Sequence, residues 1–433
     1  MSEMWYGERP QHWKSKRIKN IFALIDERNF KPLSEVRLLT LYTAYGVRPH
    51  DEIEKTTGNR AVTADNYKIV HANDIIVNII LCWQGAIGLS KHDGVTSPAY
   101  DVYRAKSKKI NVGYYNYLFR LPSFSGECYK AGRGIMAMRW RTYSDQFTTI
   151  EVPIPPREEQ DQIVRYLDWK VSQINKLINA KRRQIGLLQE KKYALVSKTV
   201  TNVSNKVTRG RVGRFYNVTL GKMLQPNKKR DGDIYANYMC AANIKWSGIK
   251  LSPLKQMWFS ESELAQYLVI EGDLLVTEGG DVGVSALWNN ELDECYVQNS
   301  VHLVRSKENS SKYLYYWLLH LKMTGWIDNA CNKATIAHFT KDKLENAPLL
   351  LPALDGQLTI ALQLDEQCIK IDDIVAKLSE ELTLLNEYRI RLISDVVTGK
   401  KNVHGIAVPQ YETAEITTET VETEAEEHDE SNQ

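Results

Sequence analysis

The sequence predicts an α+β protein in which two similar globular domains alternate with two long helices, and the helices pair as an antiparallel coiled coil. Three observations carry this prediction: a passage that occurs twice, a heptad pattern after each copy, and matching short motifs in the segments between. At 433 residues the chain is also too long for one ordinary hydrophobic core. The expected order is domain, helix, domain, helix, as a pseudo-twofold internal repeat.

The repeated passage reads "VPIPPREEQDQIVRYLD" at 152–168 and "LLLPALDGQLTIALQLD" at 349–365. It aligns Pro155 with Pro352 and Gln160 with Gln357, an offset of 197 residues. Proline followed by polar residues is ordinary chemistry for a first helical turn. The offset, however, holds without a gap for about 47 positions, up to "LVSKTVT" and "LISDVVT". A constant spacing over that length indicates a duplication.

Each copy continues into a heptad pattern with apolar residues at two positions of seven, which is typical of a coiled-coil seam. A single stripe of this kind would indicate a helix packed on a local core, but two matching stripes favour mutual pairing. The predicted seam consists of Val164, Leu167, Val171, Ile174, Ile178, Ile185, Leu188 and Leu195 in the first helix and Leu364, Ile371, Val375, Leu378, Leu382, Leu385 and Leu392 in the second.

The relative direction of the helices follows from their length. Each helix of about 40 residues is roughly 60 Å long at ~1.5 Å per residue. Only about 150 residues separate them, and a compact domain of that size has a radius of gyration of roughly 15 Å. Such a domain connects the two helices only if the end of the first lies near the start of the second. We therefore expect an antiparallel pair.

The globular segments repeat as well, with gaps. "NDIIVN" at 73–78 resembles "GDLLVT" at 272–277, and a glycine turn follows each. "YDVYR" at 100–104 aligns with "VHLVR" at 301–305, and "YYNYLF" at 114–119 aligns with "YLYYWLL" at 313–319. Short β-branched runs predict strands and the Tyr-rich segments predict helices against them, so each half is expected to be α+β.

Composition narrows the functional classes. No run approaches the ~18 apolar residues that span a bilayer, and the N-terminus lacks the apolar core of a signal peptide, so we expect a cytoplasmic protein without membrane association. The six cysteines show no CxxC pair, and we expect them to be reduced and mostly buried. The net charge of +3 conceals an acidic C-terminus with nine acidic residues and no Lys or Arg from His404 onward. Residues 1–403 carry 56 basic and 44 acidic groups.

A basic chain with this internal symmetry suggests a DNA-binding protein. Two similar domains at opposite ends of an antiparallel rod match the dyad of duplex DNA, so that each domain can face it equivalently. A rod of roughly 60 Å corresponds to about seventeen base pairs. This geometry favours a target in two parts separated by an unread spacer.

In the order of these motifs, the chain resembles the specificity (S) subunits of type I restriction-modification systems. The resemblance rests on "WKSKRIKNIF" near the start, the two strand and glycine-turn motifs, "QNSVHLVR" at 298–305, the two helix starts, and "LISDVVTGK" at 392–400. It covers nearly everything from Trp5 to Lys400. One departure is "ALDGQLTIALQ", which lacks the usual acidic pair before Gln357.

The resemblance implies a DNA-recognition subunit without catalytic activity of its own. Residues 1–153 and 204–350 would be target-recognition domains that each read half of a bipartite sequence in double-stranded DNA. Residues 154–203 and 351–403 would be the spacer helices that dock two modification (methyltransferase) subunits. S-adenosylmethionine would belong to those subunits, and ATP and Mg to separate restriction and translocation subunits, so we expect no cofactor in this chain. The acidic C-terminus lies outside the resemblance. Residues 404–433 lack hydrophobic periodicity and are expected to be a disordered acidic tail; the alternative is that the tail folds back, mimics phosphate and tunes DNA affinity.

The residues themselves also argue against catalysis. The sequence has no GxxxxGK[ST] loop, no Asn-Pro-Pro-aromatic pocket for methyl transfer and no HExxH. His302 and His320 lie on apolar stretches and are expected to be core residues rather than metal ligands. Asp273, Glu278 and Asp281 lie near glycines, where turn chemistry explains them better than a magnesium site.

Candidate DNA contacts are basic and amide residues beside aromatic ones, because Arg and Lys read guanine edges and Asn or Gln read adenine. For any one of them, a solvated surface charge is an equally good explanation. The candidates are Trp83, Gln84, Arg133, Arg139 and Arg141 in the first half and Lys228, Lys229, Arg230, Asn243 and Lys245 in the second.

Two other classes of function stay open from the sequence. A coiled-coil protein adaptor would show no salt-dependent DNA binding, and the basic body of the chain counts against it. A nuclease or methyltransferase with an unrecognised site would show activity as the isolated chain, and the missing motifs count against that.

Overall fold

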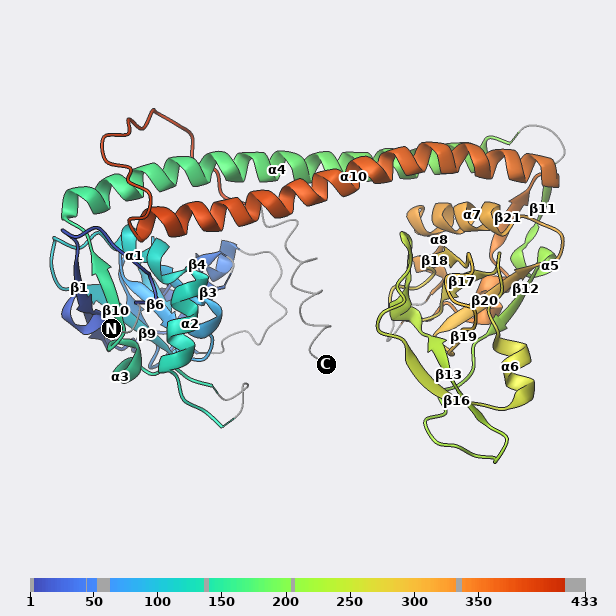
Figure 1. The fold of residues 1–433 in the computed structure, drawn as a ribbon, viewed down its shortest axis with the longest axis horizontal. Coiled ribbons are helices and arrows are strands. Elements are labelled where there is room, and N and C mark those ends of the chain that lie inside the picture. Colours follow the sequence, from blue (N-terminus) through green and yellow to red (C-terminus); the bar gives the residue numbers. More distant parts are fainter. Residues whose placement is uncertain are drawn as a thin grey trace. The chain divides into compact units, whose positions relative to one another are not determined.

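The computed structural model describes residues 4–43, 45–52, 63–135, 140–203, 207–331 and 337–416 (Figure 1). The contacts divide the chain into two compact units, which we call unit 1 (residues 1–182 and 380–433) and unit 2 (residues 183–379). The sequence-based boundaries treat the long helices as segments of their own, whereas the contacts share each long helix between the two units. Among the helices of the described ranges, none combines the length and apolar composition needed to cross a lipid bilayer.

In its described residues, unit 1 contains short strands, three short α-helices and parts of both long helices. Its strands are β1 (Lys14–Arg17), β2 (Phe22–Ile25), β3 (Leu39–Tyr42), β4 (Gly46–Pro49), β5 (Lys68–Val70), β6 (Ile75–Asn78), β7 (Ile87–Leu89), β8 (Gly94–Thr96), β9 (Tyr100–Ala105) and β10 (Glu151–Ile154). Its helices are α1 (Val112–Phe119), α2 (Pro122–Ala131) and α3 (Ser144–Phe147), with the start of α4 (Arg157–Thr201) and the end of α10 (Leu354–Val397).

A four-stranded antiparallel sheet, in the order β2-β9-β6-β7, forms the centre of unit 1, and β1 pairs separately with β10. α1 begins where Asn111 accepts hydrogen bonds from the amides of Gly113 and Tyr114, a usual N-cap. The apolar side of α1 buries Tyr114, Tyr115 and Leu118 among the aromatic residues of the core. The same hydrophobic cluster continues into both long helices, so the sheet and the helices share one core.

Unit 2 repeats this plan with additions. Its strands are β11 (Thr208–Arg211), β12 (Tyr216–Leu220), β13 (Ile234–Met239), β14 (Ile244–Lys245), β15 (Gly248–Ile249), β16 (Lys255–Phe259), β17 (Leu274–Thr277), β18 (Ser285–Leu287), β19 (Tyr296–Val297), β20 (Val301–Ser306) and β21 (Pro348–Leu351). Its short helices are α5 (Val212–Phe215), α6 (Glu261–Tyr267), α7 (Ser311–Met323), α8 (Trp326–Ala330) and α9 (Lys341–Glu345).

The duplication seen in the sequence is confirmed in the sheets. The order β12-β20-β17-β18 in unit 2 matches β2-β9-β6-β7 in unit 1, and β11 pairs with β21 as β1 pairs with β10. The motifs at 73–78 and 272–277 form β6 and β17, and the Tyr-rich motifs form α1 and α7, as predicted. In unit 2, β13 pairs antiparallel with β16 and parallel with β19, and in unit 1, β3 pairs antiparallel with β4 while Leu38 makes a parallel bridge to Val95 of β8. Unit 2 adds the helix α6.

The two long helices run antiparallel in each unit (Figure 1). In unit 1, Asn175 is bonded to Arg389 at 3.0 Å, and Lys181, further along α4, pairs with Glu381, which precedes Arg389 on α10. In unit 2, the Lys192 ammonium lies 2.7 Å from the Asp372 carboxylate. Each of the fifteen predicted seam residues is buried or half-buried. Leucines outside the seam, such as Leu177 and Leu384, are exposed.

The start of each long helix is fixed by a buried glutamine. Gln160 accepts a hydrogen bond from the Asn111 amide at 2.7 Å and donates to the Pro155 carbonyl at 2.8 Å. Gln357 accepts from the Ser310 amide at 2.9 Å and donates to the Pro352 carbonyl at 2.9 Å. The passage is thus written twice because each copy ties one long helix to one globular half. The missing acidic pair near Gln357 leaves this junction unchanged.

The acidic tail differs from its prediction in its first part. Residues 404–416 were expected to be disordered, but they lie along α4 and are held there by side chains of that helix, including Gln162, Ser172 and Asn175. The disorder was inferred from the lack of hydrophobic periodicity, whereas the segment is held mainly through its backbone carbonyl groups, which no side-chain pattern reveals. Residues 417–433 lie outside the described ranges.

Candidate nucleic-acid interface

The first group of candidate contacts lies in the turn after β6 in unit 1. Trp83 and Gln84 belong to a 3-10 turn, Cys82–Gln84, which Gly85 ends with a φ of 89°. The left-handed conformation favours glycine at that point. The Trp83 indole N–H donates to the Ile80 carbonyl at 2.8 Å, and the Gln84 side chain is left exposed. The rigid turn therefore presents an amide that is free to reach a ligand.

Trp83 and Gln84 line an open cavity of about 510 Å³. Thr43, at the turn between β3 and β4, lines the same cavity, and the Arg120 guanidinium donates to the Thr43 carbonyl at 3.0 Å. Burial lowers the pKa of Arg120, with a further contribution from the charge of Arg389. The cavity therefore has an aromatic wall beside a cation whose hydrogen bonds fix the adjacent hairpin.

Arg133 and Arg141 lie opposite each other on two short extended segments of unit 1. Their backbones exchange two hydrogen bonds, of 2.8 and 3.0 Å. The Arg133 side chain is exposed and lies 5.1 Å from the centre of the Tyr143 ring, in a cation–π contact. The Arg141 guanidinium donates to the Trp140 carbonyl at 3.0 Å. Arg139 falls outside the described residues.

Stacked aromatic rings connect these two groups. Trp140 stacks on Tyr129 with ring centres 4.9 Å apart, and Tyr129 contacts Trp83 at 5.7 Å. The structure therefore brings Trp83 and Gln84 together with the segment that carries Arg133 and Arg141. Tyr129 was not singled out in the sequence, because a tyrosine in an amphipathic helix gives no signal that distinguishes a surface ring from a core ring.

In unit 2, the basic run Lys228, Lys229 and Arg230 lies in a loop with a fixed backbone. The Asp233 carboxylate accepts hydrogen bonds from the backbone amides of Lys229 and Arg230 at 3.0 and 3.1 Å. All three basic side chains are exposed, and the Lys228 ammonium lies 5.6 Å from the centre of the Trp258 ring. The loop thus presents three cations from a preorganised conformation.

A chain of hydrogen bonds between buried polar residues holds the Asp233 carboxylate in place. The Lys222 ammonium donates to Gln225 at 2.9 Å, and Gln225 donates to Asp233 at 3.2 Å. Lys222 also pairs with Glu263 of α6. Partial burial raises the pKa of Glu263, but hydrogen bonds from Lys222 and Ser260 outweigh this and hold the pKa below the usual glutamate value. Nothing in the sequence pattern identified Asp233 or Lys222 as supports of the loop.

The prediction for Asn243 does not fit the structure. Its side chain is buried, accepts from the Cys240 amide at 3.0 Å and donates to the Lys250 carbonyl at 2.8 Å. The amide therefore closes the 3-10 turn Ala241–Asn243 and is not available to a base. Asparagine favours such local caps, and the sequence alone does not separate this use from recognition. Lys245, two residues later, is exposed.

Residues considered for metals or catalysis have structural partners. Asp273 forms a two-pronged ion pair with Arg305 at 2.8 and 2.7 Å, and Asp281 pairs with Lys322 at 2.8 Å. Burial raises the pKa of Glu278. His302 is buried as predicted, bonds the Phe339 carbonyl at 2.7 Å, and has a pKa lowered by burial. Within the described parts of the chain, no His, Cys, Asp and Glu side chains cluster in a way that would hold a metal ion.

All six cysteines are free, and five of them are buried, as expected for a chain with reduced thiols. The sixth, Cys240, is half-buried in the loop that Asn243 closes.

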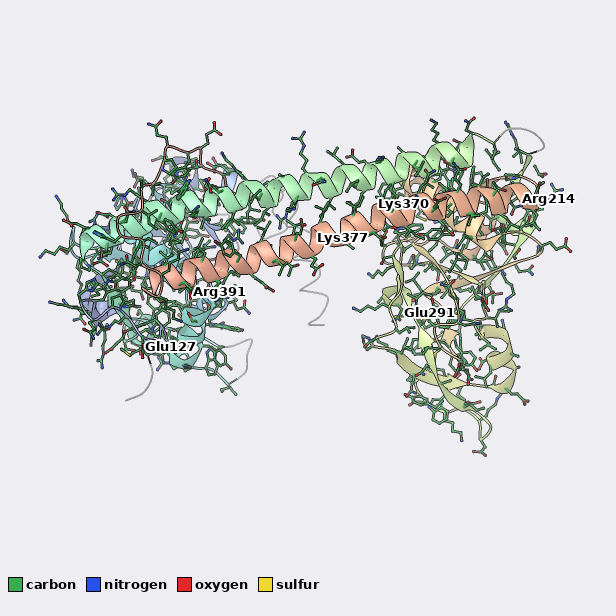
Figure 2. The ribbon with its side chains drawn as sticks, turned by 45° about the horizontal axis from the view of Figure 1, so that its top comes forward. Glu127, Arg214, Glu291, Lys370, Lys377 and Arg391 are labelled. Carbon is green, nitrogen blue, oxygen red and sulfur yellow. The ribbon has the colours of Figure 1, made fainter. Side chains whose placement is uncertain are left out.

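Charged side chains also follow the long helices. Figure 2 shows Lys370, Lys377 and Arg391 along α10, and all three are exposed. Exposed apolar residues precede them on the first half of α10, among them Leu354, Leu358, Leu362 and Ile369. These four recur at intervals of four, four and seven residues and so lie on one side of the helix.

Comparison with known proteins agrees with this architecture. Residues 10–186 and 226–384 match the sequence family described as "Type I restriction modification DNA specificity domain". A solved structure described as "Structural basis underlying complex assembly and conformational transition of the type I R-M system" is similar, with a TM-score of 0.65, 15% sequence identity, and coverage of 91% of this chain and 100% of the other.

The crystal structure of the HsdS subunit from Thermoanaerobacter tengcongensis is 16% identical, with a TM-score of 0.48, and the match covers 93% of this chain and 100% of that one. At 15% identity, the first of these structures supports only the fold. The family match, by contrast, occurs twice and covers both globular halves and most of both long helices. The chain therefore belongs to the family of type I restriction-modification DNA specificity subunits.

Proposed function

We propose that this chain is the DNA-recognition subunit of a type I complex in which unit 1 and unit 2 each read one half of a bipartite target. The observation that carries the proposal is the matched framework of the two units, each with a group of basic and amide residues beside aromatic rings in the loops outside it. In unit 1 this group is Gln84 with Arg133 and Arg141, and in unit 2 it is Lys228 with Lys229 and Arg230. Equivalent frameworks with different loops suit two different half-sequences.

The chemistry of these groups suits duplex DNA. Arg and Gln side chains form paired hydrogen bonds with guanine and adenine edges, while the remaining cations neutralise phosphates. Their loops are held by the protein itself, by Asp233 in unit 2 and by the Trp83 turn in unit 1. A loop ordered before binding loses little entropy on contact with DNA, which favours specificity.

The long helices supply the second part of the proposal. Their exposed apolar side, with Leu358 and Leu362 on α10, would dock modification subunits, because contiguous apolar surface on a helix favours burial against a partner. Those two subunits would hold S-adenosylmethionine and methylate adenine. ATP and Mg would belong to the restriction and translocation subunits. In this scheme the chain itself is not catalytic, acts in the cytoplasm, and sets the spacer through the length of its helices.

The experiment that tests this function is a map of methylated adenines. The chain would be co-expressed with its modification subunits in a host that lacks other adenine methylation, and methylation would be read at single-base resolution. We expect one two-part motif with a fixed spacer. A stable complex that adds no methylation and shows no salt-dependent affinity for duplex DNA would instead favour a protein adaptor, and methylation by the chain alone would show that it is an enzyme.

A further inference from the structure

Residues 404–416, which we call the C-terminal strap, make a regular set of contacts with α4. Ser172 donates to the Glu412 carbonyl at 3.0 Å, Asn175 to the Ala414 carbonyl at 3.0 Å, and Asn179 to the Glu415 carbonyl at 2.9 Å. Ser172 also accepts from the Ala414 amide at 2.6 Å. The three helix residues are spaced by three and four positions, so they form one polar side of α4.

These contacts use the backbone of the strap and not its acidic side chains. The strap would therefore stay attached to α4 if a glutamate were replaced by glutamine. The Glu412 side chain points to solvent, 93% exposed, and pairs only loosely with Lys176 at 3.3 Å. The Glu415 side chain behaves differently, because it reaches across to the globular part of unit 1.

There the Glu415 carboxylate meets two cations. One oxygen pairs with the Arg48 guanidinium, and the other lies 3.1 Å from the Lys91 ammonium. Partial burial raises the pKa of Glu415, but the hydrogen bonds from Arg48 and Lys91 outweigh this and hold the pKa below the usual glutamate value. The carboxylate therefore stays charged at neutral pH and occupies the space between the two cations.

Arg48 and Lys91 belong to the same region as the candidate DNA contacts of unit 1. Arg48 lies on β4, in the hairpin whose turn, at Thr43, lines the cavity with Trp83 and Gln84. Lys91 lies in the turn after β7, the strand that follows the Trp83 turn in the chain and pairs with β6. An arginine and a lysine that share one anionic group form a site that also fits a phosphodiester oxygen pair.

We propose that Arg48 and Lys91 form a phosphate-binding site for DNA in unit 1 and that Glu415 occupies this site in the free protein. The strap is then an internal competitor that DNA must displace, and it lowers the affinity for any duplex irrespective of sequence. This inference rests on the proposed DNA-recognition function. The sequence supplies further acidic residues just beyond the strap, at positions 419, 422 and 424.

A strap that only stabilises the fold would have a different effect on DNA affinity. Val408 and Ile416 pack against the core of unit 1, so the strap also stabilises the fold. If stabilisation were its only role, removal of the Glu415 charge would weaken the fold or leave it unchanged, without any gain in DNA affinity. Removal of the Glu415 charge therefore raises DNA affinity if the strap competes with DNA, and does not raise it if the strap only stabilises the fold.

The test compares Glu415→Gln with Glu412→Gln in the full chain bound to its modification subunits. Both variants remove one negative charge from the strap, but only Glu415 touches Arg48 and Lys91. The probe is a fluorescent duplex of mixed sequence, about 30 base pairs long, titrated at several salt concentrations. We expect E415Q to bind about three- to fivefold more tightly at low salt, with a salt slope steeper by about one to two, and E412Q to bind like the wild type.

A second set of variants assigns the effect to the two cations. In a chain that already carries Arg48→Ala and Lys91→Ala, E415Q should give no further gain, because the phosphate site is gone. A gain that persists there, or an equal gain from E412Q, would overturn the proposal and indicate a general charge effect.

The outcomes also separate this inference from the proposed function. If the wild type and E415Q bind the duplex equally well, the competitor role is wrong and DNA recognition stands. If neither binds above the level of the modification subunits alone, both the recognition function and the strap proposal fail. Hydrogen exchange at residues 411–416 without DNA checks that the strap of E415Q stays on α4; a strap that has detached would show that Glu415 anchors it, contrary to the backbone attachment inferred above.

Discussion

Unit 1 and unit 2 share a framework of polar contacts and differ in the loops outside it. Arg104 pairs with Asp74 in unit 1 as Arg305 pairs with Asp273 in unit 2, each through two hydrogen bonds of 2.7 to 2.8 Å. Tyr117 donates to Asp168 and Tyr316 to Asp365, both at 2.7 Å. The arginine–aspartate pairs join two strands of the central sheet, and the tyrosine–aspartate pairs join a short helix to a long helix. The helix α6 of unit 2, by contrast, has no counterpart among the described elements of unit 1.

The two units keep the same polar contacts where the fold depends on them and differ in the loops that the fold does not need. The shared contacts brace each sheet and attach its neighbouring short helix to a long helix in the same way. They therefore fix the position from which the proposed DNA-contacting loops extend. The loops are free to differ because they do not support the framework. In unit 2, the Asp233 carboxylate holds the loop at 228–230 by accepting hydrogen bonds from its backbone amides. Because Asp233 is not one of the shared contacts, a change in this loop leaves the shared framework intact.

The largest expected effect comes from shortening the part that the units share. Deletion of residues 180–186 from α4 together with residues 378–384 from α10 removes one heptad from each helix at facing positions and keeps the seam in register. Seven residues correspond to about 10 Å of helix, or about three base pairs. We expect the spacer of the methylated motif to shorten by that amount while both half-sequences stay the same. An unchanged spacer would contradict the role of the helices as a ruler.

The junction glutamines test whether the framework is equivalent in the two units. Gln160→Leu leaves the Asn111 amide without its acceptor, and Gln357→Leu does the same to the Ser310 amide. A buried amide that loses its partner costs about 1–3 kcal/mol. We expect both variants to lower the free energy of unfolding, measured by denaturant titration, by similar amounts in that range.

The control for this pair is a change of the same chemistry on the surface of the same helices. Gln173→Leu on α4 and Gln363→Leu on α10 alter exposed residues and should leave stability nearly unchanged. A loss confined to one of the two junction variants would break the equivalence of the units.

The support of the unit 2 loop gives a smaller effect with an informative sign. Asp233→Ala makes the chain more basic, so electrostatics alone predicts tighter DNA binding. Loss of the hydrogen bonds to the Lys229 and Arg230 amides predicts weaker and less selective binding, since the loop then has to be ordered by DNA. We expect Asp233→Ala to lower the affinity for the mapped target by up to about tenfold, measured in a salt titration. The double variant Lys229→Ala/Arg230→Ala, which lacks the two cations themselves, is the reference. Tighter binding by the alanine variant would show that loop order is irrelevant.

The smallest expected effect is a difference in stability between variants of Asp168 and Asp365, the two aspartates that accept hydrogen bonds from tyrosines. Asp365 also receives the Lys312 ammonium at 2.5 Å, whereas burial raises the pKa of Asp168 above the usual value, with the Tyr117 hydrogen bond partly opposing it. A raised pKa favours the neutral acid in the fold, so this contribution is present at low pH and is lost as the pH rises through the folded-state value.

At neutral pH we therefore expect Asp168→Asn to leave stability unchanged or raise it, and any gain should shrink as the pH falls. Asp365→Asn should lose about 0.5 kcal/mol, because the ion pair with Lys312 is partly exposed. Thermal unfolding at several pH values measures both. Equal losses for the two variants at neutral pH would show that the two sites are alike after all.

Much of the fold was predictable because the signal was periodic or duplicated. The spacing of Leu167, Ile174 and Ile178 predicted the seam, and the offset of Gln160 and Gln357 pointed to equivalent junctions. Asn243 was misassigned because an amide that caps a local turn and one that reads a base have the same sequence signature. The Glu415 contact was beyond prediction, since Arg48 and Lys91 lie more than 300 residues away in the chain and carry no pattern that names a partner.

The most direct test of two equivalent reading halves is a chain in which both halves are the same. Residues 14–154 would be replaced by a second copy of residues 208–351, from the first strand of one half to the last strand before its helix. The methylated adenines of the complex would then be mapped beside those of the wild type. Our account predicts two different half-sequences for the wild type and an inverted repeat of one of them for the symmetric chain. A symmetric chain that folds and methylates an asymmetric motif would contradict it.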